Sequence, residues 1–527
     1  MSDVSTLTTS APDRSWESLP DRLNPPMPSS GWRGWIGPVI VMIIGGLIRF
    51  VSLGRPHGIA FDETYYAKDA ISLLRFGYEK QFVGDANDLL LNSDGNIANL
   101  KIFQDAAEYM VHPPFGKWAI ASGEALFGAT PFGWRFAVAV LGTLSILILA
   151  RTLRRMTRSD LVGTIGGLIL ALDGIAIVMS RSAVLDNVLS FCVLAGFAFL
   201  VLDRDATRKR LAKLVGHSSF DEIATTWGPR LGLRPLRWAA AVMLGLACAV
   251  KWSGIWFIVV FGIMTVLWDV SARRMIGVKR PISATLLRDA PLAALSMVGI
   301  AIVVYLSTWT GWFLNENAWG RTWGLNDPSW IPQSLRALWH YHSDAWNFHT
   351  TLESPHAYQS NPIGWLLQVR PTSFYWHSDK GVDATCGADH CVSAVNAIGN
   401  PIVWWAATIA LIHQLWRWMG RRDWRSGAVL AGVAAGWLPW MLYLNRTIFS
   451  FYTVAFVPFI AMALAMSLGT VIGPSTASKE RRVWGALIAG GVILAIVFTA
   501  WWMYPVWTGE YVPYEVWRMR MWMPSWI

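Results

Sequence analysis

Apolar stretches recur along this chain at lengths that match the thickness of a membrane. A helix needs about 20 apolar residues to cross roughly 30 Å of hydrocarbon. Of the 527 residues, 54% are hydrophobic and 15% are charged, against roughly 25% charged in an ordinary soluble domain. These features predict an all-α polytopic membrane protein. Eleven membrane helices are predicted, at 35–53, 132–150, 161–179, 187–202, 237–250, 252–268, 290–308, 401–416, 427–443, 450–472 and 484–503.

Basic residues fall in alternate loops between the predicted helices. With eleven helices, more than half of the 44 Lys and Arg residues lie on one side. The positive-inside rule assigns that side to the cytoplasm. The N-terminus is then cytoplasmic and the C-terminus extracytoplasmic, in a multi-pass protein of the cell membrane. Because topology accounts for the net charge of +10, no nucleic-acid partner is expected.

The same pattern divides the chain into three parts. Residues 1–33 are polar, lack the apolar core of a signal peptide, and are predicted to be a disordered cytoplasmic tail. Residues 34–505 are predicted to form the transmembrane domain, and residues 506–527 an extracytoplasmic tail. Two long outer loops, 54–131 and 309–400, are rich in aromatic residues, so a function is expected for them.

The first outer loop contains a predicted surface helix that begins near Asp62. In FDETYYAKDAISLLRFG, Tyr66, Ala70 and Leu73 share one face, and Gly77 is a suitable terminator. Asp62 is well placed as the N-cap. Such a helix is expected to lie in the plane of the membrane interface.

Two of the four cysteines, Cys386 and Cys391, lie in the second outer loop in TCGADHC. Outside the cytoplasm they can close a small disulfide loop. A metal site completed by His377 or His390 is the alternative. The other two cysteines are expected to be buried thiols.

Asp62 and Glu63 place two carboxylates just beyond the first membrane helix. A carboxylate there can act as a general base on a hydroxyl that arrives from the aqueous side. The helix N-terminus is expected to lower its pKa. The plainer interpretation is that Asp62 only caps the helix. No metal or other cofactor is required, although this pair could hold a divalent cation.

The motif HPPFGKW, from His112 to Trp118, lies in the same outer loop. Its prolines fix a turn, Gly116 allows close backbone approach, and Lys117 begins the next apolar stretch. A structural corner is the plain interpretation. The motif gains weight because it shares the outer loop with Asp62 and Glu63.

Cations recur at the predicted outer edges of the membrane helices, on the less basic side of the protein. A single such cation can simply extend its charge to water. Four of them from different hairpins could cradle the phosphate of a lipid whose tail stays in the bilayer. They are Arg135 in PFGWRFA, Arg181 with Asp186 in MSRSAVLDN, Lys251 in AVKWSG and Arg446 in LNRTIFSFY.

An ordered set of motifs between about residues 35 and 505 resembles the protein O-mannosyltransferase family, in its bacterial, actinobacterial-type form. The set consists of FDETYYAKDA, HPPFGKW, SRSAVLD, AVKWSG and YHSDAWNFHTTLESPHAYQSNPIGWLLQVRP. The resemblance implies a GT-C membrane glycosyltransferase that uses a polyprenyl-phosphate-mannose donor. It would transfer mannose, with inversion, to Ser or Thr hydroxyls of proteins emerging across the membrane. The implied partners are the lipid-linked donor, the secreted acceptors, the membrane and the protein translocation machinery.

The resemblance also implies roles for individual residues. Asp62 is the implied base with Glu63 beside it, Lys251 matches a phosphate-contacting lysine, and Arg135 matches a donor-binding arginine. We assign His112, Lys117 and Asp186 to the acceptor site or the loop motifs. The 309–400 loop is too short for the β-trefoil domain of eukaryotic members, so acceptor selection must differ.

The chemistry fits one carboxylate opposite a cation cradle. A Ser or Thr hydroxyl is a very weak acid and benefits from a base, whereas a phosphate leaving group needs cations and no proton donor. Glycosidases, in contrast, place two carboxylates around the bond.

Two alternative functions remain. One is another polyprenyl-phosphate-dependent GT-C enzyme that acts on lipid or cell-wall glycan, and the other is a transporter with charges along a central path.

Overall fold

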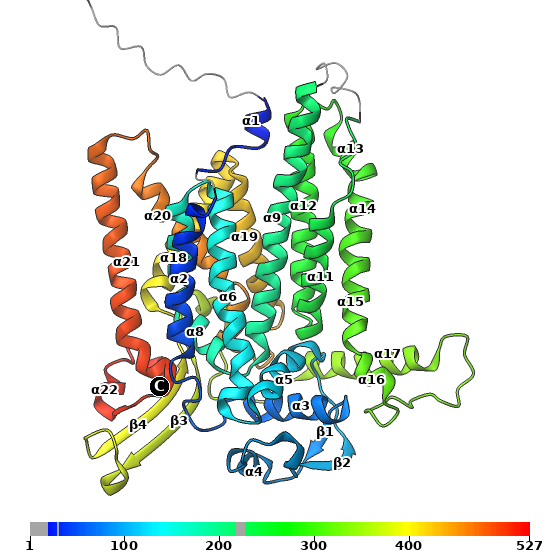
Figure 1. Ribbon diagram of the computed structural model, residues 1–527, viewed down its shortest axis with the longest axis vertical. Helices are drawn as coiled ribbons and strands as arrows, with labels where there is room; N and C mark the ends of the chain where they lie inside the picture. The colour runs from blue at the N-terminus through cyan, green and yellow to red at the C-terminus, as the bar shows by residue number, and fades with distance from the viewer. Residues whose placement is uncertain (1–18, 29–30, 218–226) are drawn as a thin grey trace, which may run out of the picture.

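The structure is a computed structural model that describes residues 19–28, 31–217 and 227–527. Long helices run side by side in a bundle, and the two long loops gather at one end of it (Figure 1). The bundle helices are α2 (Arg33–Phe50), α6 (Pro131–Thr157), α7 (Asp160–Ala171), α8 (Gly174–Arg181), α9 (Leu185–His217), α11 (Pro235–Val250), α12 (Gly254–Met275), α14 (Ala290–Ala294), α15 (Ile300–Thr308), α18 (Pro401–Arg421), α19 (Trp424–Trp437), α20 (Val457–Ile472) and α21 (Lys479–Thr508).

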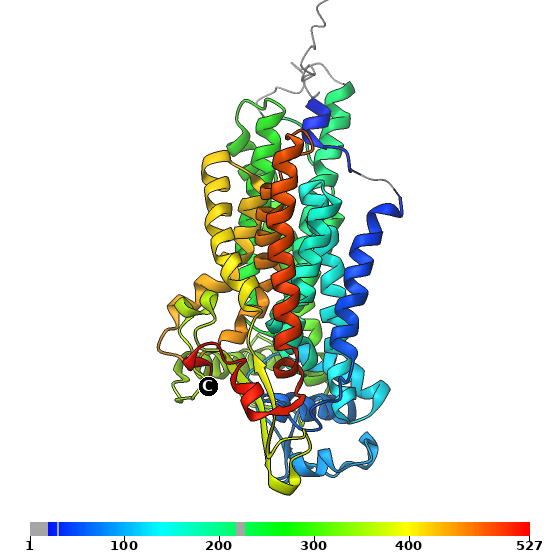
Figure 2. The ribbon, with the colours of Figure 1, turned by 90° about the vertical axis from the view of Figure 1, so that its left-hand side faces the viewer.

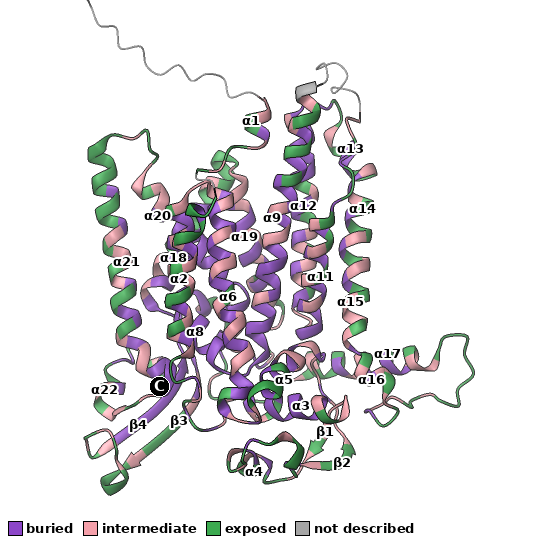
Figure 3. Ribbon diagram, viewed as in Figure 1, coloured by how far each residue is buried: buried purple, intermediate pink, exposed green. Residues whose placement is uncertain are grey.

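Each of the eleven predicted membrane segments contains helix, with α14 and α15 joined through a π-helical turn into one segment. By length and composition, six helices of the described residues can cross a membrane, or seven if the bent pair α7 and α8 is one span. The multi-pass architecture is therefore confirmed, whereas the count of eleven spans stays a prediction. Figure 3 shows why the helices differ: α9 and α11 are buried inside the bundle, while α15 and α21 expose much of their surface.

The break between α7 and α8 is stabilised by charged side chains from inside the bundle. The two helices meet at 59°. Asp173 accepts a hydrogen bond from the first turn of α8, and Arg49 of α2 donates to the carbonyls of Leu170 and Ala171. Backbone groups freed by a break in a membrane bundle need such partners, because no water is at hand.

The two ends of the described chain lie at opposite ends of the bundle (Figure 1). α1 (Leu19–Leu23) lies at one end, and the C-terminus lies at the other, beside both long loops; Figure 2 shows the same arrangement from the side. The predicted odd number of spans requires such a placement, and the number itself stays a prediction. The predicted disordered tail is wrong in part, because Leu23 is buried against Leu211 and Ala272. Residues 1–18 of that tail lie outside the described residues.

Short helices lie across the loop end of the bundle. They are α3 (Glu63–Phe76), α4 (Ala86–Leu91), α5 (Phe115–Phe127), α16 (Thr310–Leu314) and α17 (Gln333–Thr351). The predicted helix after Asp62 is confirmed as α3. Gly77 ends it with a φ of 80°, a conformation that glycine adopts without steric cost. Tyr66, Ala70 and Leu73 are buried, so α3 packs against protein on that face.

Two small antiparallel sheets complete the loop end. β1 (Lys80–Phe82) pairs with β2 (Phe103–Ala107). The second sheet has the order β3–β4–β5, from Thr372–Lys380, His390–Ala397 and Tyr511–Pro513. The predicted C-terminal tail is therefore part of the fold. It contributes β5, α22 (Tyr514–Arg518) and the buried side chain of Trp526.

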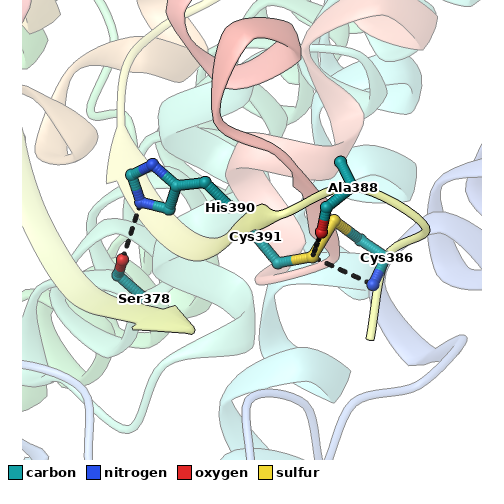
Figure 4. Close-up of a disulfide and its surroundings, with 5 residues drawn as sticks. All are labelled: Ser378, Cys386, Ala388, His390 and Cys391. Carbon is teal, nitrogen blue, oxygen red and sulfur yellow. Dashed lines mark hydrogen bonds between the residues drawn. A yellow bond between two sulfur atoms is a disulfide. The ribbon is translucent and has the colours of Figure 1, made fainter. Parts of the chain in front are cut away.

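Cys386 and Cys391 form a disulfide near the turn of the β3–β4 hairpin (Figure 4). The metal alternative is thereby wrong, because the disulfide consumes both thiols. His390 instead hydrogen-bonds to Ser378, and His377 hydrogen-bonds to Asp379. The free cysteines are buried, as predicted.

Candidate active site

Asp62 lies at the start of α3 with a carboxylate that has no hydrogen-bond partner among the described residues. Its backbone is already helical (φ −70°, ψ −1°), and its side chain makes no capping bond. The capping interpretation is therefore wrong for the side chain. Burial raises the pKa of Asp62 to about 6, with Lys251 opposing the rise and Asp186 adding to it. The expected lowering by the helix terminus is outweighed by burial.

Lys251 follows the last residue of α11 and approaches the same place from inside the bundle. Its Nζ lies 2.7 Å from Oδ2 of Asp186, which is in the first turn of α9, and 5.1 Å from the ring centre of Tyr452. Both charges act on the pKa of Asp62. The structure therefore joins three predicted residues from distant parts of the chain into one site. The ion pair with Asp186 holds the ammonium group of Lys251 at a fixed position.

Two histidines and an arginine surround Lys251 on the loop side. The rings of His112 and His349 stack with centres 5.2 Å apart. Nε2 of His349 donates to the Val111 carbonyl, so Nδ1 is free to accept from Nη2 of Arg446 at 3.3 Å. Burial, together with Arg446 and Lys251, lowers the pKa of His349 to about 4. The cations therefore face a neutral imidazole.

Several polar atoms around Lys251 have no internal partner in the described part of the chain. Nε of Arg446 and Nδ1 of His112 are both buried without a hydrogen bond. The carboxylate of Asp62 is also unpaired. A buried polar group without a partner costs free energy. These groups are therefore available as hydrogen-bonding partners for a bound polar molecule.

Glu63 and Arg135 form a separate, fully buried ion pair. Arg135 Nη2 lies 2.7 Å from Glu63 Oε2, and Nε lies 2.8 Å from Oε1. Glu63 also accepts from the N–H groups of Ala60 and Ala183. Arg135 donates further bonds to three carbonyls of the 53–58 segment. Neither group has free hydrogen-bonding capacity, so their expected catalytic and donor-binding roles do not fit; both fix the loop that carries Asp62.

Arg181 also has a structural position. It ends α8 and donates to carbonyls at the C-terminal end of α2 and just beyond it, at Arg49, Val51 and Ser52. The last carbonyls of a helix have no partner within the helix, and a cation stabilises them. These contacts occupy both terminal nitrogens of Arg181 and leave only its buried Nε without a partner among the described residues, so the expected role in the phosphate cradle does not fit.

Lys117 belongs to a second charged cluster beside the site. It is fully buried in α5 and pairs with Glu79. Burial lowers the pKa of His112, and the charges of Lys251 and Lys117 lower it further. Asp69 is also fully buried, and burial raises its pKa well above the usual range. The HPPFGKW motif therefore contributes His112 to the site directly and Lys117 to its surroundings.

Three residues of the site were missed by the sequence reasoning. Tyr452, His349 and Tyr66 all lie against the charges described above. His349 occurs inside one of the motifs quoted above, and Tyr66 occurs in the helix after Asp62. Tyr452 is the last residue of the segment LNRTIFSFY quoted above for Arg446. It follows Arg446 by six residues and joins the site only because the 3-10 helix Ser450–Ala455 turns it inward.

Comparisons with known proteins agree over nearly the whole chain. Residues 39–312 match the family model described as dolichyl-phosphate-mannose-protein mannosyltransferase, and residues 334–526 match the C-terminal four-helix membrane region of protein O-mannosyltransferases. A polyprenol-phosphate-mannose–protein mannosyltransferase of Mycobacterium tuberculosis is 38% identical over 510 residues, covering 94% of this chain and 92% of the relative. The corresponding protein of Corynebacterium glutamicum is 32% identical, covering 85% and 87%.

A solved structure has the same fold. The Saccharomyces cerevisiae protein O-mannosyltransferase Pmt1–Pmt2 complex, bound to the sugar donor, superposes with a TM-score of 0.70. The match covers 95% of this chain and 94% of that chain, at 14% sequence identity. The predicted GT-C fold is therefore confirmed.

Proposed function

This chain belongs to the family of polyprenol- and dolichyl-phosphate-mannose–protein mannosyltransferases, and we propose that it transfers mannose from a polyprenyl-phosphate donor to Ser or Thr hydroxyls on the outer side of the cell membrane. One observation carries the assignment of the site. The unpaired carboxylate of Asp62 lies near enough to the Lys251–Asp186 pair for both charges to shift its pKa. The helix α3, which begins directly after Asp62, lies where the loop layer meets the bundle (Figure 1). A lipid donor can reach this level from the bilayer, and a polypeptide can reach it from water.

In the proposed reaction, Asp62 accepts the proton of the acceptor hydroxyl. The hydroxyl oxygen attacks the anomeric carbon as the bond from that carbon to the phosphate oxygen breaks, so the configuration inverts. The electron pair of the broken bond leaves on the phosphate. A pKa near 6 keeps Asp62 ionised at neutral pH yet more basic than an ordinary aspartate. The pKa of Asp62 therefore suits a general base at neutral pH.

Lys251 and Arg446 are proposed to stabilise the leaving phosphate. Asp186 holds Lys251 in place, and His349 holds Arg446. The buried Nε of Arg446 and Nδ1 of His112 are free to meet donor oxygens. Cations whose positions are fixed before the reaction stabilise the charge of the leaving phosphate most strongly in a site that excludes water.

We propose that the reaction proceeds without a divalent cation between Asp62 and Glu63. Both oxygens of Glu63 already accept bonds from Arg135 and from backbone N–H groups. A cation there would have to displace the Arg135 guanidinium from a buried pair. Glu63 is therefore unsuited to be a metal ligand beside Asp62.

The acceptor proteins are proposed to be secreted chains that emerge from the translocation machinery. The long loops lie at the end of the bundle opposite α1, and we propose that this end is extracytoplasmic. There, an emerging chain would meet the site before it folds.

The test is transfer by purified enzyme. Radiolabelled polyprenyl-phosphate mannose is mixed with a Thr-containing peptide, and labelled glycopeptide is measured for wild-type protein and for Asp62→Asn. Transfer by the wild type and its loss in the variant are expected. Labelling of lipid or glycan acceptors in place of the peptide would contradict the proposal and favour the related GT-C function.

A further inference from the structure

The sheet beside the active site has an open edge along β3. β4 pairs with β3 on one side and with β5 on the other, over Cys391–Ser393. β3 therefore forms one border of the sheet. In Figure 1, β3 lies between β4 and α3, so its free side faces the loop layer that carries Asp62. Natural proteins usually cover or shorten such edges, because an open strand is a template for pairing.

The register of the hairpin identifies which backbone groups point outward. The N–H of Gly381 donates to the carbonyl of Asp389, its direct partner across the turn. Because hydrogen-bonded pairs alternate in an antiparallel ladder, the odd-numbered residues 375–379 bond to β4. The even-numbered residues direct their N–H and C=O groups to the free side, and these groups have no partner among the described residues. These residues are Trp376, Ser378 and Lys380.

The same edge leads directly to the proposed base. The N–H of Phe61 donates to the carbonyl of Phe374 at 2.8 Å, and the two rings stack with centres 4.9 Å apart. Phe374 occupies an irregularity in the ladder, between Ser373 and Tyr375. Its carbonyl thus faces away from β4 and toward the loop. The N–H of Phe61 therefore bonds to the first backbone group of β3 that points away from β4, the carbonyl of Phe374. Asp62 follows Phe61 directly in the chain.

We propose that the acceptor polypeptide binds as an added strand along the outer edge of β3, and that this strand delivers its hydroxyl to Asp62. The inference rests on the proposed function and adds the mode of acceptor recognition. The outward groups begin at Trp376, immediately beyond the position that Phe61 occupies. A chain paired with them is therefore guided at one end to Asp62.

An extended polypeptide fits this edge better than the other molecules of the reaction. Main-chain hydrogen bonds hold an added strand with little regard to its side chains. The free edge from Trp376 to Lys380 is roughly 17 Å long at about 3.4 Å per residue, enough for about five acceptor residues. The outer half of β3 is largely exposed, so the approach is open to water. A folded domain offers no free strand there, and the edge would therefore select unfolded segments.

The first experiment modifies the acceptor and leaves the enzyme unchanged. A peptide with a single Thr is N-methylated at one backbone position at a time, and KM and kcat for mannose transfer are measured. An added strand directs every second N–H to its partner. On one flank of the Thr, methylation is therefore expected to raise KM about fivefold at alternate positions, the loss of one net hydrogen bond, and to leave kcat nearly unchanged.

The second experiment modifies the edge. Ser378→Pro removes one outward N–H and no bond to β4, and proline is tolerated on such edges. Ser378→Ala is the matched control, because both variants lose the hydroxyl contact with His390 (Figure 4). The proline variant is expected to raise the peptide KM about fivefold over the alanine variant. Donor affinity and melting temperature should be equal in the two.

The outcomes separate this inference from the proposed function. If the unmodified peptide is mannosylated but methylation has no alternating effect, and the two Ser378 variants share one KM, the strand inference is wrong and the proposed function stands. If the peptide is not mannosylated at all, both are wrong. If Ser378→Pro melts early, the methylation series on the wild-type enzyme decides alone.

Discussion

Arg135 and Glu63, 72 residues apart in the sequence, form a fully buried ion pair with Nη2 and Oε2 2.7 Å apart. The same guanidinium donates to carbonyls on both sides of the cis peptide bond Arg55–Pro56. The residue next to the proposed base therefore anchors the loop, and it leaves Asp62 as the carboxylate free for chemistry. Of these two neighbouring carboxylates, only Glu63 has an arginine partner.

Asp62→Asn is expected to lower turnover by a factor of about 10²–10⁴, the usual contribution of a general base. Donor affinity should change little, because Asn keeps the size of the side chain. Since the Asp62 side chain makes no capping bond, Asp62→Ala should be no less stable than Asp62→Asn. Turnover is measured with labelled donor, and stability by thermal unfolding in detergent. Turnover within about threefold of wild type in Asp62→Asn would remove Asp62 from the mechanism.

The pH dependence of kcat/KM is expected to have an acidic limb near pH 6. Asp62 accepts a proton only when it is ionised, and burial raises its pKa to about 6. The rate should therefore fall about tenfold per pH unit below pH 6 and level off above pH 7. An ordinary aspartate, with a pKa of about 3.9, would give a flat profile from pH 5 to 8. The profile is measured at saturating donor with limiting peptide.

Lys251→Met is expected to weaken donor binding by about 1.5–3 kcal/mol, the value of a hydrogen bond to a charged group. The change also leaves Asp186 buried without its cation, so stability should fall as well. Adding Asp186→Asn is the control that separates the two effects. The double variant should regain melting temperature without regaining donor affinity. Recovery of both would mean that Lys251 only balances Asp186.

Glu63→Gln is expected to cost about 3–5 kcal/mol of stability, because it leaves the buried Arg135 guanidinium without a counter-charge. Arg135→Met should cost a similar amount, and the double variant should be less destabilised than the two single changes together. Unfolding free energies of the four proteins form the double-mutant cycle. Full stability in Glu63→Gln would contradict the anchoring role.

A reporter enzyme that is active only outside the cytoplasm is expected to be active when it is fused after Ile527. α1 and the C-terminus lie at opposite ends of the bundle, and the basic loops favour a cytoplasmic N-terminus. A second fusion within the loop before α7, near Arg158, serves as the cytoplasmic control. If the two fusions reported the same side of the membrane, the number of spans would be even.

Periodicity and hydropathy were enough to predict the helices. The segments that contain α2, α6, α9 and α21 were all placed correctly, because a chain in a bilayer must satisfy its backbone locally and be apolar where it meets lipid. The helix after Asp62 and the disulfide of Cys386 and Cys391 were also predicted, since each rests on residues close together in sequence. The family was recognised from ordered motifs and is confirmed.

Pairing between distant charges could not be read from the sequence. Arg135, Arg181 and Lys251 look alike as cations at the outer ends of predicted helices. In the folded protein, Arg135 pairs with a carboxylate and Arg181 donates to carbonyls at the end of a helix. Lys251 pairs with Asp186 near Asp62. A charge near a membrane edge binds whichever partner the fold brings within about 3 Å, and the local sequence does not specify that partner.

The membrane class, the arrangement of basic loops and the motifs that mark the family can all be read from the amino-acid sequence. The unpaired state of Asp62, the rise of its pKa on burial and the presence of Tyr452 and His349 in the site depend on the folded chain. The two groups of properties differ because the underlying interactions act over different distances along the chain. Hydropathy and helix signals act within about twenty residues, whereas burial and hydrogen bonding depend on segments hundreds of residues away in the chain.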